Sequence, residues 1–465
     1  MSIQSAAHWT SAPLGSLGQI RLGKMLDKAK NTGSMVQYLR NVNVRWFKFD
    51  LSDMKSLRLP DAEQELFSVR DGDVFICEGG EPGRCAVWHG GTNLIVYQKA
   101  LHRFRTSGAI APRFLMYQLR HQAYSGALLK AFSGTTIKHL TRESLSRHDV
   151  TLPPTQEQQL IAAKLDAVLA RVDACRERLD CLPGILKRFR QSVLAAATSG
   201  GLTEEWREQQ GASDDWLECD IQAIAQVGTG STPLRSNQNF FASSGTPWIT
   251  SAATSQAVVL LANEFVTDAA IAAHRLRRFP VGTLLVAMYG EGKTRGQVTE
   301  LGIEATINQA CAAVVVDTRQ AMKSFVKLAL QANYLEMREL AEGGSQPNLN
   351  LSKVKSFPLS LPPLGEQAEI VRRVESLFSW ADRLEARHAA ARAQVARLTP
   401  SLLAKAFRGE LVPQDPADEP ASELLKRLTQ QPSDNPTAPV KRRGPKPHHA
   451  KASHAASNVR EESSS

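Results

Sequence analysis

The chain has 465 residues, of which 42% are hydrophobic and 22% charged, so it is too long for one compact core and too apolar to be mainly disordered. Its formal net charge of +10 favours a polyanionic partner without identifying one. Six cysteines without a CxxC pair argue against a zinc ribbon or a disulfide framework and favour a reducing compartment. No apolar run approaches the ~18 residues that a membrane-spanning helix needs, and the first residues lack a secretory signal pattern, so we expect a cytoplasmic protein without membrane contact.

The positive charge is concentrated in the first third of the chain. Residues 1–155 hold 20 basic and 12 acidic side chains, whereas residues 214–364 hold 12 basic and 13 acidic ones. A basic segment is either an ordinary solvated surface or a surface that contacts phosphates. The charge alone leaves both interpretations open.

The sequence contains two similar copies of one pattern. The offset between matching residues changes by only four over more than 200 residues. Trp9 and Trp216 stand 207 residues apart, and Gly80-Glu81 precedes Gly290-Glu291 by 210. The offset is 209 for LPPTQEQ at 152–158 with LPPLGEQ at 361–367, and for SVLAAATSGGL at 192–202 with SLLAKAFRGEL at 401–411. A repeat of this length predicts a tandem duplication.

In chain order, each copy consists of a body of about 145 residues and a helical arm of about 40. The bodies contain short alternating runs such as DVFICEGG, NLIVYQ and TLLVAMYG, which predict β-strands joined by turns, with a helix near FLMYQLRHQAY and FVKLALQANYLEMREL. The fold class is therefore α+β. The predicted segments are a first body at 1–155, a first arm at 156–200, a linker at 201–213, a second body at 214–364, a second arm at 365–411 and a disordered basic, Pro-rich tail at 412–465.

Both arms carry a narrow apolar stripe with a seven-residue repeat, which is typical of a helix that pairs with another helix. The natural partner of each arm is the other arm, as an antiparallel coiled coil; the alternative is that each arm packs on its own body. Thr155 and Gln158 predict a capping box at the first start, and Pro183 and Pro400 should kink or interrupt the arms. The predicted coiled-coil residues are Ile161, Leu165, Val168, Val172, Leu179, Ile370, Val374, Leu377 and Leu384.

The catalytic signals in the chain are weak. Gly292-Lys293-Thr294 resembles the end of a phosphate-binding loop, but the position of its first glycine is Ala287, and the matching segment GGEPGR at 79–84 has no lysine there. The Pro pairs at 153–154 and 362–363 follow leucine, so an amino-methyltransferase motif is absent, and the histidines form no metal-ligand spacing. We therefore expect no catalytic residues and no metal site.

The order of these features resembles the specificity subunit of type I restriction-modification enzymes. The resemblance covers roughly residues 8–411 and includes LGKMLDKAK before YLRNVNVRWF, GTGSTPLRS before PWIT, the LPPxxEQ arm starts and Asn308-Gln309. The first copy departs from the pattern, with Thr198-Ser199-Gly200 in place of Phe407-Arg408-Gly409 and Tyr97-Gln98 in place of Asn308-Gln309.

The resemblance implies two target-recognition domains that read a bipartite, asymmetric sequence in double-stranded DNA. It also implies a non-catalytic subunit of a DNA adenine methyltransferase and endonuclease complex, in which the arms dock two methyltransferase subunits and, through them, the restriction (helicase-nuclease) subunits. This chain would carry no cofactor, whereas S-adenosylmethionine, ATP and Mg belong to the partners.

Candidate DNA-binding residues are polar or basic side chains in loops of the two bodies, because Arg, Lys, Asn, Gln, Ser and Thr supply the donors and acceptors that reach groove edges or phosphates. In the first body they are Lys24, Lys28, Lys30, Arg40, Asn41, Asn43, Arg45, Thr135, Thr136 and Lys138. In the second body they are Ser231, Thr232, Arg235, Asn237, Thr250, Ser251, Arg295, Ser345, Gln346 and Asn348. Any one of them can also be an ordinary exposed loop residue.

Two other functional hypotheses stay open at this point. One is a nuclease or ATPase that uses the 289–295 loop, and the other is a coiled-coil adaptor without DNA readout. Selection of binding sites from random duplex DNA separates them, because only a specificity subunit predicts a two-part motif with a fixed gap.

Overall fold

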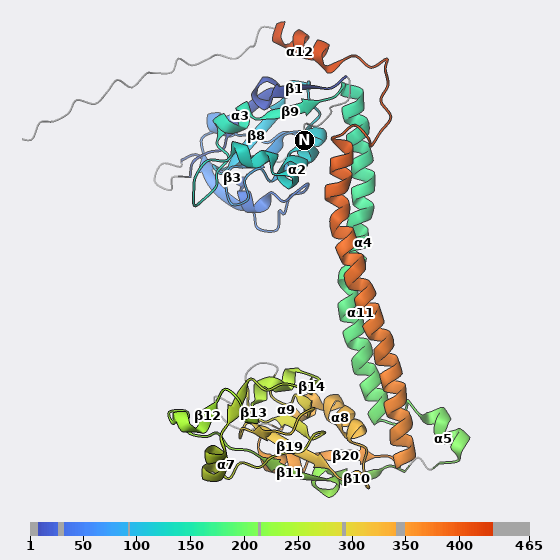
Figure 1. Ribbon diagram of the computed structural model, residues 1–465. Helices are drawn as coiled ribbons and strands as arrows, with labels where there is room; N and C mark the ends of the chain where they lie inside the picture. Colours follow the sequence, from blue (N-terminus) through green and yellow to red (C-terminus); the bar gives the residue numbers. More distant parts are fainter. Residues whose placement is uncertain are drawn as a thin grey trace, which may run out of the picture. The chain divides into compact units, whose positions relative to one another are not determined.

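The computed structural model describes residues 8–26, 32–91, 94–212, 215–290, 294–340 and 349–430 (Figure 1). By its internal contacts the chain forms two compact units, one made of residues 1–165 and 402–465 and the other of residues 166–401. These units cut through both long helices, so the domain boundaries that we draw from the repeat remain a prediction. None of the described helices is long and apolar enough to cross a membrane.

The first body consists of short strands and helices, as the alternating sequence predicts. Its elements are β1 (Thr10–Pro13), η1 (Leu14–Ser16), β2 (Gly18–Leu22), β3 (Ser34–Leu39), η2 (Asn41–Asn43), β4 (Lys55–Leu59), α1 (Asp61–Leu66), β5 (Val74–Cys77), β6 (Cys85–Val87), β7 (Ile95–Tyr97), β8 (Leu101–Thr106), α2 (Pro112–Ser125), η3 (Ala127–Ala131), α3 (Arg142–Arg147) and β9 (Asp149–Leu152). The strands form sheets of order β2-β8-β5-β6, β4-β3-β7 and β1-β9. Strands β5 to β7 are buried along their whole length, which explains their continuous apolar runs.

The second body repeats this arrangement. Its elements, with the short helix that precedes them, are α5 (Glu204–Gln210), β10 (Leu217–Asp220), α6 (Ile221–Ile224), β11 (Ala225–Thr229), η4 (Gln238–Phe240), β12 (Phe241–Ala242), β13 (Thr246–Ile249), η5 (Ser251–Ser255), β14 (Val258–Val259), β15 (Glu264–Val266), α7 (Asp268–His274), β16 (Leu284–Ala287), β17 (Val298–Leu301), β18 (Thr306–Ile307), β19 (Cys311–Val316), α8 (Lys323–Ala332), α9 (Tyr334–Glu339), α10 (Leu351–Lys355) and β20 (Pro358–Leu361).

The sheet orders show that the two bodies share a common topology, to which the second body adds β14 and β12 as edge strands. The order β11-β19-β16-β17 repeats β2-β8-β5-β6, and β15-β13-β18 repeats β4-β3-β7, including the parallel pairing of the last two strands. The strand that opens each body also pairs with the strand that closes it, β1 with β9 and β10 with β20. The predicted α+β duplication is therefore confirmed.

Each body is followed by one long helix, α4 (Thr155–Thr198) or α11 (Leu364–Ala406), and α12 (Ala421–Gln430) follows the second arm. Within the second unit the two long helices lie side by side and run antiparallel (Figure 1). Arg176 of α4 donates to Thr399 of α11 at 2.9 Å, whereas Arg190 donates to Asp382 at 2.7 Å. Residue numbers thus rise along one helix as they fall along the other, which confirms the antiparallel pairing.

The predicted heptad residues lie on the covered side of these helices. Ile161, Leu165, Val172, Ile370 and Val374 are buried, and Val168, Leu179, Leu377 and Leu384 are half-buried. Ile370 and Val374 share a core cluster with Phe325 of the second body and with Val193 of α4, so the start of the second arm packs on its own body as well as on the other arm. Pro183 and Pro400 both lie inside continuous helices, so neither interrupts an arm.

The LPPxxEQ motif anchors each arm to its own body. Glu157 accepts a hydrogen bond from Trp9 Nε1 at 2.9 Å, and Glu366 accepts one from Trp216 Nε1 at 3.1 Å. The next residue is a buried glutamine. The predicted capping box is wrong, because the amide of Gln158 accepts from the backbone N–H of Ala111 at the start of α2 and donates to the carbonyls of Ala109 and Pro153.

Candidate nucleic-acid interface

The loop that follows β3 is held rigidly by its own polar residues. Asn43 is only 2% exposed, and its amide donates to the carbonyls of Asp50 and Asp53 at 2.9 and 3.2 Å while it accepts from Arg40 N at 2.9 Å. Arg40 donates to the Asp53 carboxylate at 2.6 Å, and this hydrogen bond lowers the pKa of Asp53. The side chains of Arg40 and Asn43 therefore support the loop, whereas Arg45 is half-exposed and forms a longer ion pair with Asp50 at 3.6 Å.

An aromatic and arginine cluster that the sequence did not reveal lies beside this loop. The Arg120 guanidinium, on α2, stands 4.2 Å from the ring centroid of Trp46 and 4.0 Å from that of Tyr124. Trp46 Nε1 donates to Glu81 at 2.5 Å, and Arg84 donates to the same carboxylate at 3.0 Å. The spacing of Arg120 and Tyr124 on one helix face was the only local signal for this cluster, because their contacts with residues 46 and 81 are long-range.

A short hairpin brings Thr135, Thr136 and Lys138 to the same region. Ser133 and His139 form a β-bridge at its base, and Leu140 N donates to the carbonyl of Glu78 at 2.8 Å, next to the turn that carries Glu81. The three predicted residues at its tip are exposed. The structure therefore gathers the η2 loop, the 78–84 turn and this hairpin on one part of the first body.

Lys24 does not join this group. Its ammonium pairs with Glu63, and its backbone bridges to Gln98. Gly23, just before it, must be glycine, because a Cβ there would lie 2.2 Å from the carbonyl oxygen of Gln98. Lys28 and Lys30 lie outside the described residues.

In the second body the segment after β11 packs on the predicted Asn308-Gln309 pair. Thr232 Oγ1 donates to the side-chain oxygen of Gln309, and Trp248 Nε1 donates to the carbonyl of Ser231 at 3.2 Å. Gly230 repeats the role of Gly23, since a Cβ there would lie 1.6 Å from the carbonyl oxygen of Ile307. The duplication thus preserves a close backbone crossing at the base of both loops.

Arg235 is the cation of this loop, and its side chain is exposed. Its guanidinium stands 5.1 Å from the ring centroid of Phe241 and 5.0 Å from that of Trp248, and it pairs with Glu264 at 2.5 Å. Nearby, Asn237 accepts a hydrogen bond from Asn239 N at 3.1 Å and so caps η4. Arg235 is positioned like Arg120, by aromatic faces and one carboxylate.

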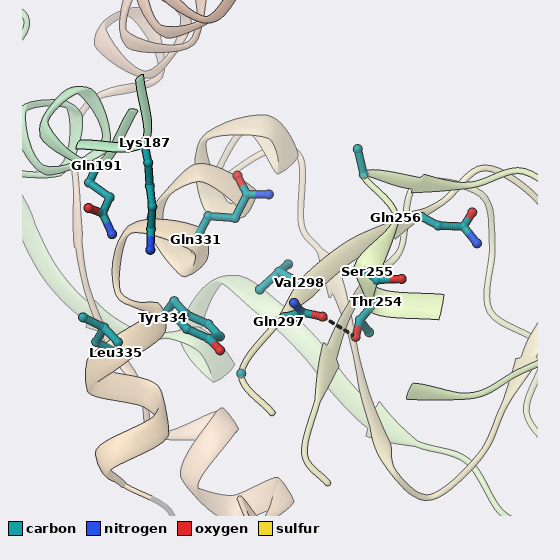
Figure 2. Close-up of a pocket in the computed structure, with 12 residues that line it drawn as sticks. Lys187, Gln191, Thr254, Ser255, Gln256, Gln297, Val298, Gln331, Tyr334 and Leu335 are labelled. Atoms are coloured by element: carbon teal, nitrogen blue, oxygen red, sulfur yellow. Dashed lines mark hydrogen bonds between the residues drawn. The ribbon is translucent and has the colours of Figure 1, made fainter. Parts of the chain in front are cut away.

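A polar groove lies between η5 and α4 within the second unit (Figure 2). It has a volume of about 570 Å³, and no acidic side chain is among the residues that line it. The predicted residues Thr250 and Ser251 immediately precede this groove in the η5 segment, and Arg295 precedes its lining residue Gly296. The lining is Lys187, Gln191, Thr254, Ser255, Gln256, Ala257, Gly296, Gln297, Val298, Gln331, Tyr334 and Leu335.

Two lysines of the second body, Lys323 and Lys327, are neutralised by one internal carboxylate. Glu300 contacts Lys323 at 2.5 Å and Lys327 at 3.3 Å. Burial alone would raise the pKa of Glu300, but the hydrogen bonds and charges of these two lysines outweigh it and lower the pKa. Ser345, Gln346 and Asn348 lie outside the described residues.

The described residues show no candidate metal centre. They contain no group of three or more His, Cys, Asp or Glu side chains that could hold a metal ion. Burial raises the pKa of the Cys77 thiol to about 11 and that of Cys311 to about 12, so neither is a reactive thiolate at neutral pH. Glu291 and Lys293, on which the nuclease or ATPase hypothesis depended, lie outside the described residues.

Comparison with known proteins places these features in a family. The family described as "Type I restriction modification DNA specificity domain" matches residues 7–180 and 213–391, one segment in each repeat. The specificity subunit of the type I restriction enzyme EcoKI from Escherichia coli K12 is 30% identical over 445 residues, covering 89% of this chain and 91% of that protein. The chain belongs to the type I restriction-modification specificity subunits.

Other relatives agree with this assignment. The StySPI specificity subunit of Salmonella potsdam is 27% identical over 433 residues, with 89% of this chain and 91% of that protein covered. Among solved structures, a chain of a type I restriction-modification system matches with a TM-score of 0.67 at 17% identity, covering 88% of this chain and 99% of that one. The HsdS subunit from Thermoanaerobacter tengcongensis matches with a TM-score of 0.58 at 18% identity, covering 87% and 98%. At these identities the two structures support the fold alone.

Membership of the family confirms the expected function. A specificity subunit determines the DNA target of its restriction-modification system, is itself non-catalytic and carries no cofactor. It is part of the type I restriction-modification complex, which binds DNA. The nuclease, ATPase and adaptor hypotheses are therefore set aside.

Proposed function

We propose that this specificity subunit reads a bipartite, asymmetric sequence in double-stranded DNA, with one half-site for each body. The two bodies share a fold, so each can present an equivalent DNA-binding surface. A DNA target that contacts both surfaces has two parts. The boundaries 1–155 and 214–364 for the two target-recognition domains are part of this proposal.

The observation that carries the asymmetry is the different chemistry at equivalent positions of the two bodies. At the repeat offset of 210 or 211 residues, Trp46, Arg120 and Tyr124 correspond to Gln256, Gln331 and Leu335. The first set forms a stack of aromatic rings around a guanidinium, whereas the second lines a groove rich in amides. Arginine suits guanine and phosphate, and glutamine suits adenine, so the two surfaces should prefer different base pairs.

Among the predicted DNA-binding residues, the exposed ones are the better candidates for direct contact. Arg45, Thr135, Thr136, Lys138 and Arg235 extend from loops that the rest of each body holds in place. Arg40 and Asn43 use their polar atoms within the loop, so we infer that they orient Arg45 and Trp46.

We further propose that the paired arms dock two methyltransferase subunits and, through them, the restriction subunits. S-adenosylmethionine, ATP and Mg would then be bound by those partners, and the complex would work in the bacterial cytoplasm, where its DNA is found. The support is the pairing of α4 with α11, which leaves long exposed faces on both helices, and the family itself.

Selection of binding sites from random duplex DNA by the full-length protein tests the proposal. We expect two short, unlike half-sites separated by a gap of fixed length. A single motif would contradict the two-domain proposal, two identical half-sites would contradict the asymmetry, and the absence of a motif would contradict direct readout by this chain.

A further inference from the structure

Inside the helix α4, one backbone carbonyl has no hydrogen-bond donor from the helix itself. Pro183 lies inside the helix and has no N–H, so the carbonyl of Leu179, four residues earlier, loses its partner within the helix. Leu179 is half-buried, and its carbonyl oxygen is directed towards α11. A shielded carbonyl without a donor is costly, and a helix that lacks this hydrogen bond bends easily at that point.

The other arm supplies the missing donor. His388 Nε2, on α11, lies 2.9 Å from the carbonyl oxygen of Leu179. Because a carbonyl only accepts, this ring nitrogen carries the hydrogen and donates it. The exposed ion pair of Arg392 with Asp180, at 3.1 Å, lies beside this contact and is accessible to water on both side chains.

The position of the contact is set by the duplication. Leu179 and His388 are separated by the repeat offset of 209, so they are the same position in the two arms. In an antiparallel pair, equivalent positions face each other only at the local two-fold axis. The contact therefore lies at the centre of the repeat symmetry. A bend in one arm at this point changes the direction of both paired helices.

We propose that His388 is a positioning residue that braces α4 at Pro183, and that it thereby keeps the gap between the two half-sites fixed. The second part rests on the proposed function, because a gap exists only if each body reads its own half-site, and it adds the assumption that the paired arms set that gap. A polar contact at one position of an apolar seam is a known means of fixing helix register. Here the polar partner is a backbone carbonyl that a proline has freed.

A double-mutant cycle on the full-length protein tests the brace without DNA. We expect H388L to lower the Tm by about 2–4 °C, as for one lost hydrogen bond at a half-buried carbonyl. In a P183A background the N–H of the new alanine takes the Leu179 carbonyl, so H388L should then change the Tm by less than half as much. P400A is the matched control, because it removes the proline of the other arm, and there H388L should keep its full effect. Equal losses in all three backgrounds would overturn the brace.

Site selection on the same variants tests the consequence for DNA. For the wild type we expect a single gap length, and for H388L a weaker discrimination against targets with one base pair more or less, by about 3- to 10-fold. H388Q, which retains an N–H donor, should restore the discrimination in part. H388L can keep the full discrimination between gap lengths while the Tm changes of H388L and P183A are non-additive. In that case the brace exists but does not set the gap. If the wild type itself selects no two-part motif, the proposed function fails, and the thermal cycle still decides the brace.

Discussion

At the scale of residues, the two arm starts use the same glutamate in different electrostatic surroundings. Glu366 is fully buried and pairs with Arg207 at 2.5 Å, and it also accepts from Thr203 and Trp216. Glu157 has hydrogen bonds from Trp9 and Gln414, but no cation in an ion pair with it is resolved in the described residues. Burial raises the pKa of Glu157, although the hydrogen bonds from Trp9 and Gln414 act in the opposite direction.

This difference predicts responses of very different size to the same substitution. E366Q should lower the free energy of unfolding by about 3–5 kcal/mol at pH 7, because it removes a fully buried carboxylate to which Arg207, Thr203 and Trp216 all donate. E157Q should lower it by no more than ~1 kcal/mol, because glutamine can still accept from Trp9 and the buried negative charge is removed. Guanidinium denaturation of the two variants and the wild type measures both values.

The pH dependence of the free energy of unfolding is the control for the E157Q prediction. The folded-state pKa of Glu157 is raised, so protonation of Glu157 stabilises the folded state. This stabilisation is fully present below the unfolded-state pKa of ~4.3. It is lost as the pH rises through the folded-state pKa. The wild type should therefore gain stability relative to E157Q as the pH falls towards 4. A difference that stays constant between pH 4 and pH 7 would contradict the raised pKa.

At the scale of elements, the narrow apolar stripe of each arm predicts that the two helices pair, but it predicts less well which side chains are buried in the pairing. The heptad positions are buried or half-buried in most turns, but Cys175, which falls on the stripe of α4, is exposed, and so is Leu398 of α11. Ion pairs such as Arg190 with Asp382 fix the facing positions, and an exposed pair contributes little by itself.

The pairing predicts that arm length sets the gap. We expect a heptad inserted after Arg190 in α4, together with one inserted after Asp382 in α11, to keep the seam paired and to lengthen the selected gap by about 3 base pairs, since seven residues of helix span ~10 Å. Both half-sites should stay unchanged. Site selection measures the gap, and an unchanged gap in a folded double insertion would exclude the arms as the spacer.

At the scale of the whole molecule, the charge is divided unequally between two bodies of one fold. Residues 1–155 carry a net +8 and residues 214–364 a net −1, and cations of the second body such as Lys323 are paired internally. The first body is therefore expected to supply most of the salt-dependent affinity for phosphates, and the second to depend on Arg235 and on uncharged donors.

This distribution is testable in the salt dependence of DNA binding. R45Q should weaken binding and reduce the slope of log K against log salt by about 1, if Arg45 contacts a phosphate. K24Q is the matched control, because the Lys24 side chain is only 24% exposed and its ammonium is in direct contact with Glu63, whereas Arg45 is 49% exposed and 3.6 Å from Asp50. The slope for K24Q should therefore change much less. Equal slopes for R45Q and the wild type would remove Arg45 from the phosphate contacts.

The sequence by itself determined the duplication, the α+β class and the paired arms. The duplication is visible when whole segments are compared at a fixed offset. The strands and the seven-residue stripes are visible in the order of residues that lie close together in the chain. It also supplied the family resemblance. It failed for the capping box at Thr155, because the Gln158 side chain is used by Ala109 and Ala111, almost 50 residues away.

Only the tertiary structure decided which polar side chains are already engaged. Asn43, Lys24 and Thr232 have the composition of DNA-reading residues, but their donors are taken up by Asp50, Glu63 and Gln309. Conversely, Trp46 and Arg120 meet only because α2 packs beside the η2 loop. The physical reason is that a hydrogen bond or a stacking contact depends on distances between groups far apart in the chain, whereas a helix or a strand depends on the order of residues close together.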